Sequence, residues 1–126
     1  MNNELKHIVE EFIQHYNALD VDKMLSLFTE DCIFENVSNS HGSMICHGKS
    51  ELRTIATEAL TLFKNRKQTI TNWVIANDKI AVEIDYAATL AIDLPNGLKA
   101  GSPLNLKGVS IYEFEGNKIK RLVDFS

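Results

Sequence analysis

The chain has 126 residues, of which 44% are hydrophobic and 24% charged, and its formal net charge is −4. A chain of this length forms one domain and can bury a core without a metal or a disulfide, so we expect a single domain over residues 1–126. The negative net charge argues against a nucleic-acid partner, and the lack of a run of about 18 apolar residues argues against a membrane span.

The first part of the chain predicts helices. Over residues 3–18, apolar side chains recur at steps of three and four positions with polar residues between them, which is typical of an amphipathic helix. Asp20 is a suitable N-cap for a short second helix, whose inner face would carry Met24 and Phe28. Ser50 is the expected cap of a third helix with its own apolar stripe.

A strand and a loop are predicted between the second and third helices. Residues 32–36, with the sequence CIFEN, are β-branched and aromatic enough to predict a strand. Residues 37–48 are rich in Ser, Asn and Gly, so we expect mostly a loop there.

The second half of the chain predicts strands. The segment 79–94 has apolar residues at its even positions and several charged residues at its odd positions, which is the period of a strand with one dry face. Further strands are expected at 67–76, 106–115 and 118–125, with a hairpin turn at 95–97. Because the helices precede the strands, the order indicates an α+β fold with helices packed on one face of an antiparallel sheet.

One carboxylate lies in the last predicted strand. Asp124 alternates with Leu122, so the two side chains share a face. If Leu122 faces the interior, Asp124 does too, and a buried carboxylate is costly unless it has a hydrogen-bond partner or takes up a proton. Asn36 and Tyr16 are the partners that we expect for it.

Four stretches, taken in order, make the sequence resemble the SnoaL-like branch of the nuclear transport factor 2-like superfamily, which includes ketosteroid isomerases, limonene-epoxide hydrolases and polyketide cyclases. The stretches are YNALDVDKMLSLFTEDCIFEN, CHGKSELRTI, VIANDKIAVEI and GVSIYEFEGNKIKRLVDF, and together they span nearly the whole chain. The resemblance implies a cone, in which a strongly curved antiparallel sheet wraps around three N-terminal helices and a single deep, mostly apolar pocket. It also implies a homodimer through the outer sheet face, but no single reaction, because this fold hosts many functions.

The residues of the steroid isomerase reaction are not matched. In ketosteroid isomerases a tyrosine of the first helix and a strand aspartic acid donate hydrogen bonds to the substrate oxygen, and a first-strand aspartate moves the proton. The aligned residues here are Phe12, Ser110 and Asn36. Phe12 has no hydroxyl and Asn36 cannot act as a carboxylate base, so we expect no steroid isomerase activity.

The limonene-epoxide hydrolase site is matched at some of its positions. That family holds its nucleophilic water with a first-strand Tyr and Asn, a last-strand Asp and a middle-strand Arg-x-Asp pair. Asn36 and Asp124 match two of these residues. Phe34 replaces the Tyr, and the charged middle pair falls on Ile84 and Tyr86. The SnoaL-type cyclases have a comparable acid–base aspartate, which Asp124 resembles in position.

Asp124 and Asn36 are therefore the candidate catalytic residues. Burial in an apolar pocket would raise the pKa of Asp124 toward neutrality, which suits a general acid or base. Structural roles stay open: Asp124 could bond a backbone amide or lie exposed at a fraying end, and Asn36 could cap the next loop. The candidate substrate contacts are Tyr16, Phe34, His41, Tyr86, Ser110 and Tyr112. For the tyrosines the alternative is a core residue with one satisfied hydroxyl.

Two other groups of polar residues are weaker candidates. Glu83 and Asp85 share one strand face, but it is the polar face, so solvent or a dimer surface is the favoured interpretation. The second group consists of Cys32, His41, Cys46 and His47. Its spacing matches no structural zinc pattern, so no metal is expected.

These observations favour a small-molecule pocket protein that needs no cofactor: an isomerase, cyclase or hydrolase acting on an apolar, oxygen-bearing substrate. A non-catalytic module for an apolar ligand and a structural dimerisation domain are the open alternatives. The N-terminus has acidic residues among its apolar ones and lacks the apolar core of a signal peptide, so we expect a cytoplasmic protein with reduced cysteines.

Overall fold

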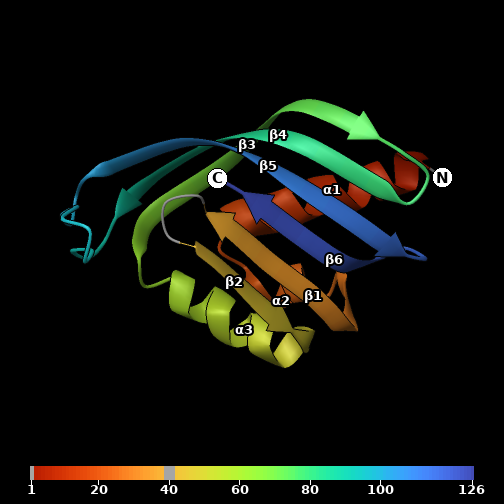
Figure 1. The fold of residues 1–126 in the computed structure, drawn as a ribbon, viewed down its shortest axis with the longest axis horizontal. Coiled ribbons are helices and arrows are strands. Elements are labelled where there is room, and N and C mark those ends of the chain that lie inside the picture. The colour runs from red at the N-terminus through yellow and green to blue at the C-terminus, as the bar shows by residue number, and fades with distance from the viewer. Residues whose placement is uncertain (1, 39–41) are drawn as a thin grey trace.

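The computed structural model describes residues 2–38 and 42–126, in which helices pack on one face of a six-stranded sheet (Figure 1). The helices are α1 (Asn2–Asn17), α2 (Val21–Leu25) and α3 (Gly48–Ala59). The strands are β1 (Phe28–Ser38), β2 (Gly42–His47), β3 (Phe63–Ile75), β4 (Lys79–Leu90), β5 (Pro103–Glu115) and β6 (Lys118–Phe125). The predicted α+β class is confirmed.

The strands are hydrogen-bonded in the order β2-β1-β6-β5-β4-β3. Neighbouring strands are antiparallel except for β1 and β6, which are parallel. The sheet is therefore mixed, where the sequence predicted an antiparallel one. β1 and β6 come from opposite halves of the chain, and local patterns do not indicate the direction in which such distant strands pair.

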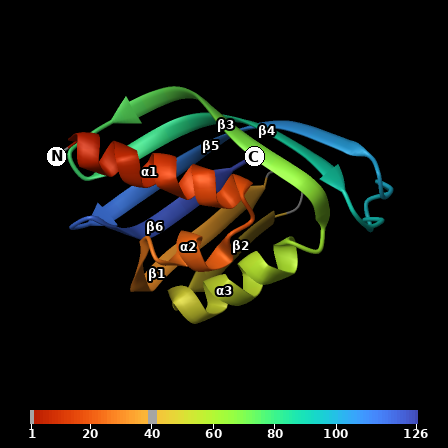
Figure 2. The same ribbon diagram turned by 180° about the vertical axis from the view of Figure 1, so that it is seen from behind.

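The sheet curves, and the helices lie on its concave side (Figures 1 and 2). Helix α1 contacts β3, and α3 contacts β1 and β2. The apolar stripe of α1 and the even-numbered residues of β4 are buried in one core, as the two periodicities predicted. Residues of this core include Val9, Phe12, Leu25, Ile80, Val82, Tyr112, Ile119 and Leu122.

The end of α1 is tied to the free edge of the sheet. The Asn17 side chain accepts a hydrogen bond from the Gln68 backbone N–H at 2.8 Å and donates one to the Gln68 carbonyl oxygen at 3.1 Å. Leu19 then adopts a left-handed conformation with φ 60°, which ends the helix. Asp20 caps α2 with its side chain, as predicted.

The loop predicted at residues 37–48 is largely a strand instead. Gly42–His47 pairs antiparallel with β1, because an edge position next to a long strand supplies backbone partners that its polar composition does not reveal. Helix α3 begins at Gly48, and its N-cap is His47, three residues before the predicted cap at Ser50. Glu51 accepts the His47 backbone N–H at 3.0 Å and so satisfies a free donor at this helix start.

Candidate functional site

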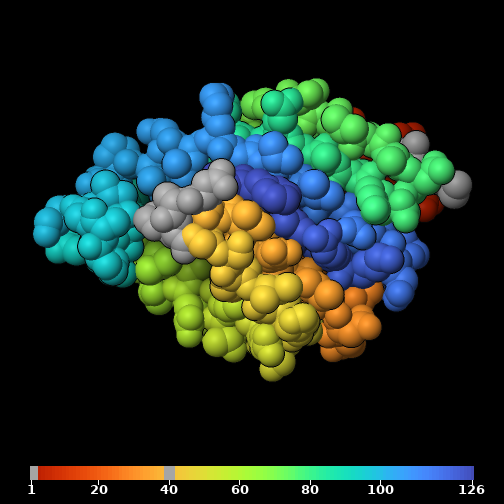
Figure 3. Space-filling model, in the orientation of Figure 1, coloured from red at the N-terminus to blue at the C-terminus, as the bar shows by residue number. Residues whose placement is uncertain are grey.

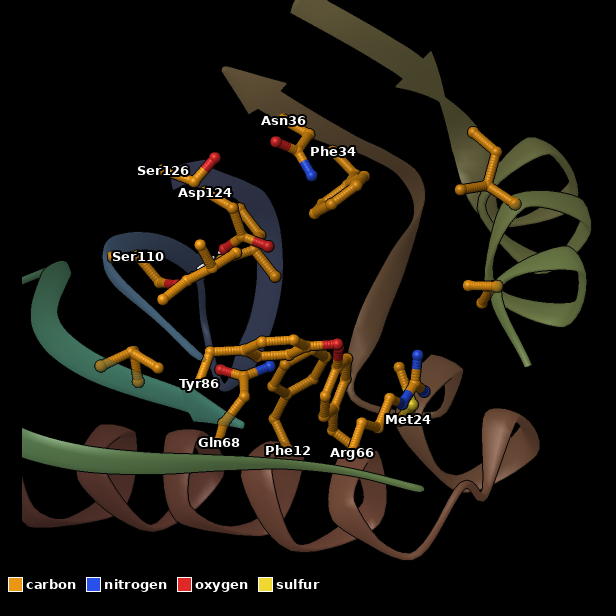
Figure 4. Close-up of a pocket in the computed structure, with 18 of the residues that line it drawn as sticks. Phe12, Met24, Phe34, Asn36, Arg66, Gln68, Tyr86, Ser110, Asp124 and Ser126 are labelled. Carbon is orange, nitrogen blue, oxygen red and sulfur yellow. Dashed lines mark hydrogen bonds between the residues drawn. The ribbon is translucent and has the colours of Figure 1, made fainter. Parts of the chain in front are cut away.

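A cavity of about 510 Å³ lies between the concave face of the sheet and the helices (Figure 4). Most of its wall is apolar, and side chains of α1, α2, α3 and the strands contribute to it. The polar residues in the wall include Tyr16, Asn36, Arg66, Gln68, Tyr86, Ser110 and Asp124. An apolar cavity with a few convergent polar groups is typical of a small-molecule site.

A second hollow lies at the surface, outside this cavity. It measures about 420 Å³, is more open, and lies between the start of α2 and the side of α3. Its lining includes Asp20, Asp22 and Arg53, and Arg53 is hydrogen-bonded to Asp22 at 2.5 Å. It contains none of the predicted site residues.

One row of polar side chains crosses three strands on the concave face. Asn36 on β1 is paired with Asp124 on β6, which is paired with Ser110 on β5. The Ser110 hydroxyl donates a hydrogen bond to Asp124 Oδ1 at 2.7 Å. The alternation of β6 thus directs Asp124 into the cavity, but its hydrogen-bond partner is Ser110 rather than Asn36 or Tyr16, the two partners expected from the sequence.

The apolar surroundings change the acidity of Asp124. Burial raises the pKa of its carboxyl from 3.8 to about 6, and the hydrogen bond from Ser110 partly opposes this rise. At neutral pH the group is mainly ionised, yet it gains and returns a proton easily because its pKa lies close to the pH.

The backbone fixes the end of β6 on both sides. The Ser126 backbone N–H donates to the Val37 carbonyl oxygen at 3.1 Å, which extends the pairing with β1 to the last residue. On the β5 side, Gly108 lies so close that a Cβ there would be 2.8 Å from the Phe125 carbonyl oxygen. Because both neighbours restrict this strand end, Asp124 occupies a defined place in the wall.

Two tyrosines form a hydrogen-bonded pair in the cavity wall. The Tyr16 hydroxyl donates to the Tyr86 hydroxyl at 3.1 Å. Burial is the main cause that raises the pKa of both hydroxyls, so both keep their protons at neutral pH. Since the Tyr86 oxygen accepts from Tyr16, the Tyr86 proton is available to a ligand.

Arg66 and Gln68 line the cavity and were missed in the sequence. The sequence predicts a strand that begins at Lys67, whereas β3 begins at Phe63, so Arg66 lies outside the predicted strand. Counting back from Ile70 in steps of two places Gln68 and Arg66 on the concave face, and this alternation was the available signal. Both are buried, with 8% and 6% of their surface exposed.

Two of the predicted site residues, Tyr112 and His41, are placed outside the site or cannot be placed. Tyr112 is fully buried in the core, with its ring centroid 5.7 Å from that of Phe12, and is not part of the cavity wall. His41 lies outside the described residues. Glu83 and Asp85 lie on the exposed face of β4, as expected, where Asp85 accepts a hydrogen bond from Lys107 at 2.9 Å. Tyr16, Phe34, Asn36, Tyr86, Ser110 and Asp124 all line the cavity.

The cysteines form part of the core. Cys32 and Cys46 are free, buried thiols, and burial raises the pKa of both. Within residues 2–38 and 42–126, no group of three or more His, Cys, Asp or Glu side chains could hold a metal ion. No helix of this part of the chain is long and apolar enough to cross a bilayer.

Comparisons with known proteins agree with this geometry. The sequence model of a family described as SnoaL-like domain matches residues 9–122. No curated protein matches the chain in sequence.

Solved structures share the fold at low sequence identity. A candidate SnoaL-like polyketide cyclase from Jannaschia sp. is 10% identical and superposes with a TM-score of 0.81, over 98% of this chain and 85% of that one. IdmH from Streptomyces antibioticus, a candidate polyketide cyclase, is 11% identical with a TM-score of 0.80, over 95% and 89% of the two chains. A protein with a ketosteroid isomerase-like fold from Catenulispora acidiphila, in complex with trimethylamine, is 18% identical with a TM-score of 0.77, over 94% and 84%.

Proposed function

We propose that this chain, which belongs to the SnoaL-like domain family, moves a proton on an apolar, oxygen-bearing small molecule held in the cavity, with Asp124 as the acid–base group and without a cofactor. The observation that carries the proposal is a carboxyl group in an apolar wall, with a pKa that burial raises to about 6. General acid–base catalysis is most effective when the pKa of the group lies near the working pH. Isomerisation, cyclisation and hydrolysis all contain such a step.

Ser110 and Asn36 support this role of Asp124. Ser110 holds Oδ1 through its hydroxyl, and the described residues offer Oδ2 no hydrogen bond, so Oδ2 is the oxygen that exchanges a proton with the ligand. Asn36 is the neighbour of Asp124 in the same row, so its amide reaches the same part of the ligand. It would orient a ligand oxygen or a water molecule there.

The proton cycle closes within the site. The Asp124 carboxylate removes a proton from a carbon or from a water molecule, and the carboxylic acid so formed returns that proton to another atom of the ligand. When a carbon proton is removed next to a carbonyl, negative charge develops on the carbonyl oxygen. Tyr86 lines the cavity, and its proton is free because its oxygen accepts from Tyr16, so its hydroxyl would stabilise this oxygen.

Steroid isomerisation is not the reaction that we propose. Phe12, Ser110 and Asn36 stand where ketosteroid isomerases have two acidic donors and a carboxylate base. Removing one positioned donor typically costs about 10²–10³-fold in rate. We expect no measurable turnover of a 3-oxo-Δ5-steroid.

A neutral probe tests the role of Asp124 without knowledge of the substrate. 5-Nitrobenzisoxazole loses its carbon-bound proton to a base, and its N–O bond then breaks to give a coloured cyanonitrophenolate. We expect the rate to rise with pH through an inflection near the pKa of about 6, because the carboxylate is the base. Asp124→Asn keeps the shape but not the basicity, and should lower the rate by about 10²-fold or more.

Asp85→Asn is the matched control. It removes a carboxylate from β4 on the outer face, where Asp85 contacts Lys107, and should leave the rate unchanged. Circular dichroism verifies that both variants fold. Equal rates for Asp124→Asn and the unmodified protein would contradict the proposal.

Binding without turnover is the second candidate function. Phe12 and Phe34 stand where relatives with known reactions carry hydroxyl groups, and both line the cavity. A protein of this kind would bind apolar compounds, and Asp124→Asn would change their affinity. It would not accelerate the opening of the probe above the rate of free carboxylate in solution.

A further inference from the structure

A buried positive charge lies across the cavity from Asp124. Figure 4 shows Arg66 and Asp124 on opposite sides, with the Tyr86 ring between them. Arg66 is 6% exposed, and its Nε and Nη2 atoms have no hydrogen-bond partner among the described residues. An arginine guanidinium keeps its charge in proteins and carries five N–H donors, so these groups are left unsatisfied.

One contact with Arg66 is present, but it is not a hydrogen bond. The guanidinium carbon lies 3.8 Å from the centroid of the Tyr16 ring. A cation over an aromatic face is attracted to it, but this attraction offsets only part of the free energy that a buried ion loses with its hydration shell. The stacking holds the planar guanidinium in place and leaves its N–H edge for another partner.

The other two arginines of the chain each have a carboxylate partner, which Arg66 lacks among the described residues. Arg53 is partly exposed and pairs with Asp22 at 2.5 Å. Arg121 lies on the outer sheet face and pairs with Glu113 and with Glu35, the latter at 3.8 Å. The most buried of the three arginines is thus the one without a carboxylate among the described residues.

We propose that Arg66 binds a carboxylate of the ligand, so that the molecule in this cavity is an amphipathic organic acid with an apolar body. The planar fork of a guanidinium matches a carboxylate with two parallel hydrogen bonds. Gln68, two positions along β3, is buried and lines the same wall, so its amide is a further donor to the anion. The inference rests on the proposed function for the reaction at Asp124, and it adds the class of substrate.

The arrangement separates binding from chemistry. The carboxylate is held at the Arg66 side, the apolar body fills the space beside Tyr86, and the reacting atom lies at the row of Asp124. An anion beside Asp124 would be repelled by the ionised carboxyl, so the charge of the ligand belongs at the opposite wall.

An exposed lysine serves as a reference. Lys107 on β5 is bonded to Asp85 at 2.9 Å on the outer face of the sheet and is solvated. Lys107→Met therefore removes the same amount of charge as Arg66→Met, without removing a buried cation from the cavity.

A pair of probes that differ in charge tests the inference. Naphthalene-1-acetate and naphthalene-1-acetamide have the same apolar body, and their affinities are measured by isothermal titration calorimetry at neutral pH. We expect the acid to bind about tenfold more tightly or better, because hydrogen bonds to charged groups are worth this factor. Arg66→Met should abolish the preference, Arg66→Lys should retain part of it, and Lys107→Met should retain all of it.

The outcomes that overturn the inference are distinct. Equal affinities of acid and amide for the unmodified protein would overturn it, and so would a preference that survives in Arg66→Met. Binding of neither compound, in a cavity of about 510 Å³, would also count against it. If Arg66→Met does not fold, the decision rests on Arg66→Lys, where an undiminished preference contradicts bidentate binding. Failure of the proposed function is seen separately, as a lack of Asp124-dependent turnover of the uncharged 5-nitrobenzisoxazole.

Discussion

Two neighbouring rows of side chains cross the six strands, one on each face of the sheet, and their polarity is the reverse of the usual pattern. The concave row consists of Met44, Asn36, Asp124, Ser110, Val82 and Trp73. The convex row consists of Ile45, Glu35, Val123, Ile111, Ala81 and Val74. Sheets normally bury apolar residues and expose polar ones. Here the inner row is polar at its centre and the outer row is mostly apolar.

The two faces also differ in how their charged residues are paired. Charges on the outer face have partners: Arg121 contacts Glu35 and Glu113, and Asp85 contacts Lys107. On the inner face, Asp124 has a neutral hydroxyl as its partner, and Arg66 has an aromatic ring. Departures from the pattern that packing alone would favour are typical of functional surfaces.

We propose that the convex row forms a homodimer interface. A charge introduced there should weaken association, and this is the largest effect that we expect. Figure 3 views the molecule from this side, where the strands lie at the surface, and Ile45 and Val74 are 53% and 64% exposed. Ala81→Asp places a charge within the row in both copies, and should weaken association by about 10³-fold. Sedimentation equilibrium measures the dissociation constant of the dimer, with Asn96→Asp in a distant loop as the control. A 14.2 kDa particle for the unmodified protein at micromolar concentration would contradict the interface.

The concave row predicts a dependence of stability on pH. The pKa of Asp124 is about 6 in the folded protein against 3.8 ordinarily, so the folded state binds more protons between these values. The free energy of unfolding therefore falls as the pH rises from 4 to above 6, by about 3 kcal/mol at most. Urea unfolding of the protein and of Asp124→Asn across this range measures the difference. A constant difference between the two curves would show that the carboxyl is not buried as described.

Replacing an arginine on the concave face and one on the convex face should change the free energy of unfolding in opposite directions. Arg66→Met removes a buried charge without an ionic partner, and should raise the free energy of unfolding of the ligand-free protein by about 1–2 kcal/mol. Arg121→Met breaks a partly exposed ion-pair network and should lower it by about 1 kcal/mol or less. Chemical unfolding of both variants gives the comparison. Equal destabilisation by the two changes would mean that Arg66 has a structural partner.

The smallest expected effect concerns a hydroxyl beneath the concave row. The Tyr112 hydroxyl is buried and has no hydrogen-bond partner among the described residues. Tyr112→Phe should be stabilising by about 1 kcal/mol, since it removes an unsatisfied polar group and keeps the ring against Phe12. Thermal unfolding measures this, and a loss of stability would reveal a partner for the hydroxyl, such as a buried water molecule.

The local structure, and the face on which each strand residue lies, can be predicted from the sequence. The periodicity of residues 3–18 predicted α1, the alternation of 79–94 predicted the buried face of β4, and the same alternation directed Asp124 inward. Asp20 as a cap was equally readable. These features depend on neighbours within a few residues, and such neighbours are visible in any single sequence.

Which residues contact each other in the site depends on how distant segments pack. The register of β5 with β6 makes Ser110 the partner of Asp124. The parallel pairing of β1 with β6 joins two strands that are far apart in the sequence. Tyr112 lies outside the cavity wall because its ring packs against Phe12 in the core. Arg66 faces the cavity because β3 begins early enough to include it. Register, strand direction and the depth of a side chain arise from contacts between distant segments, and one sequence does not encode them in any short pattern.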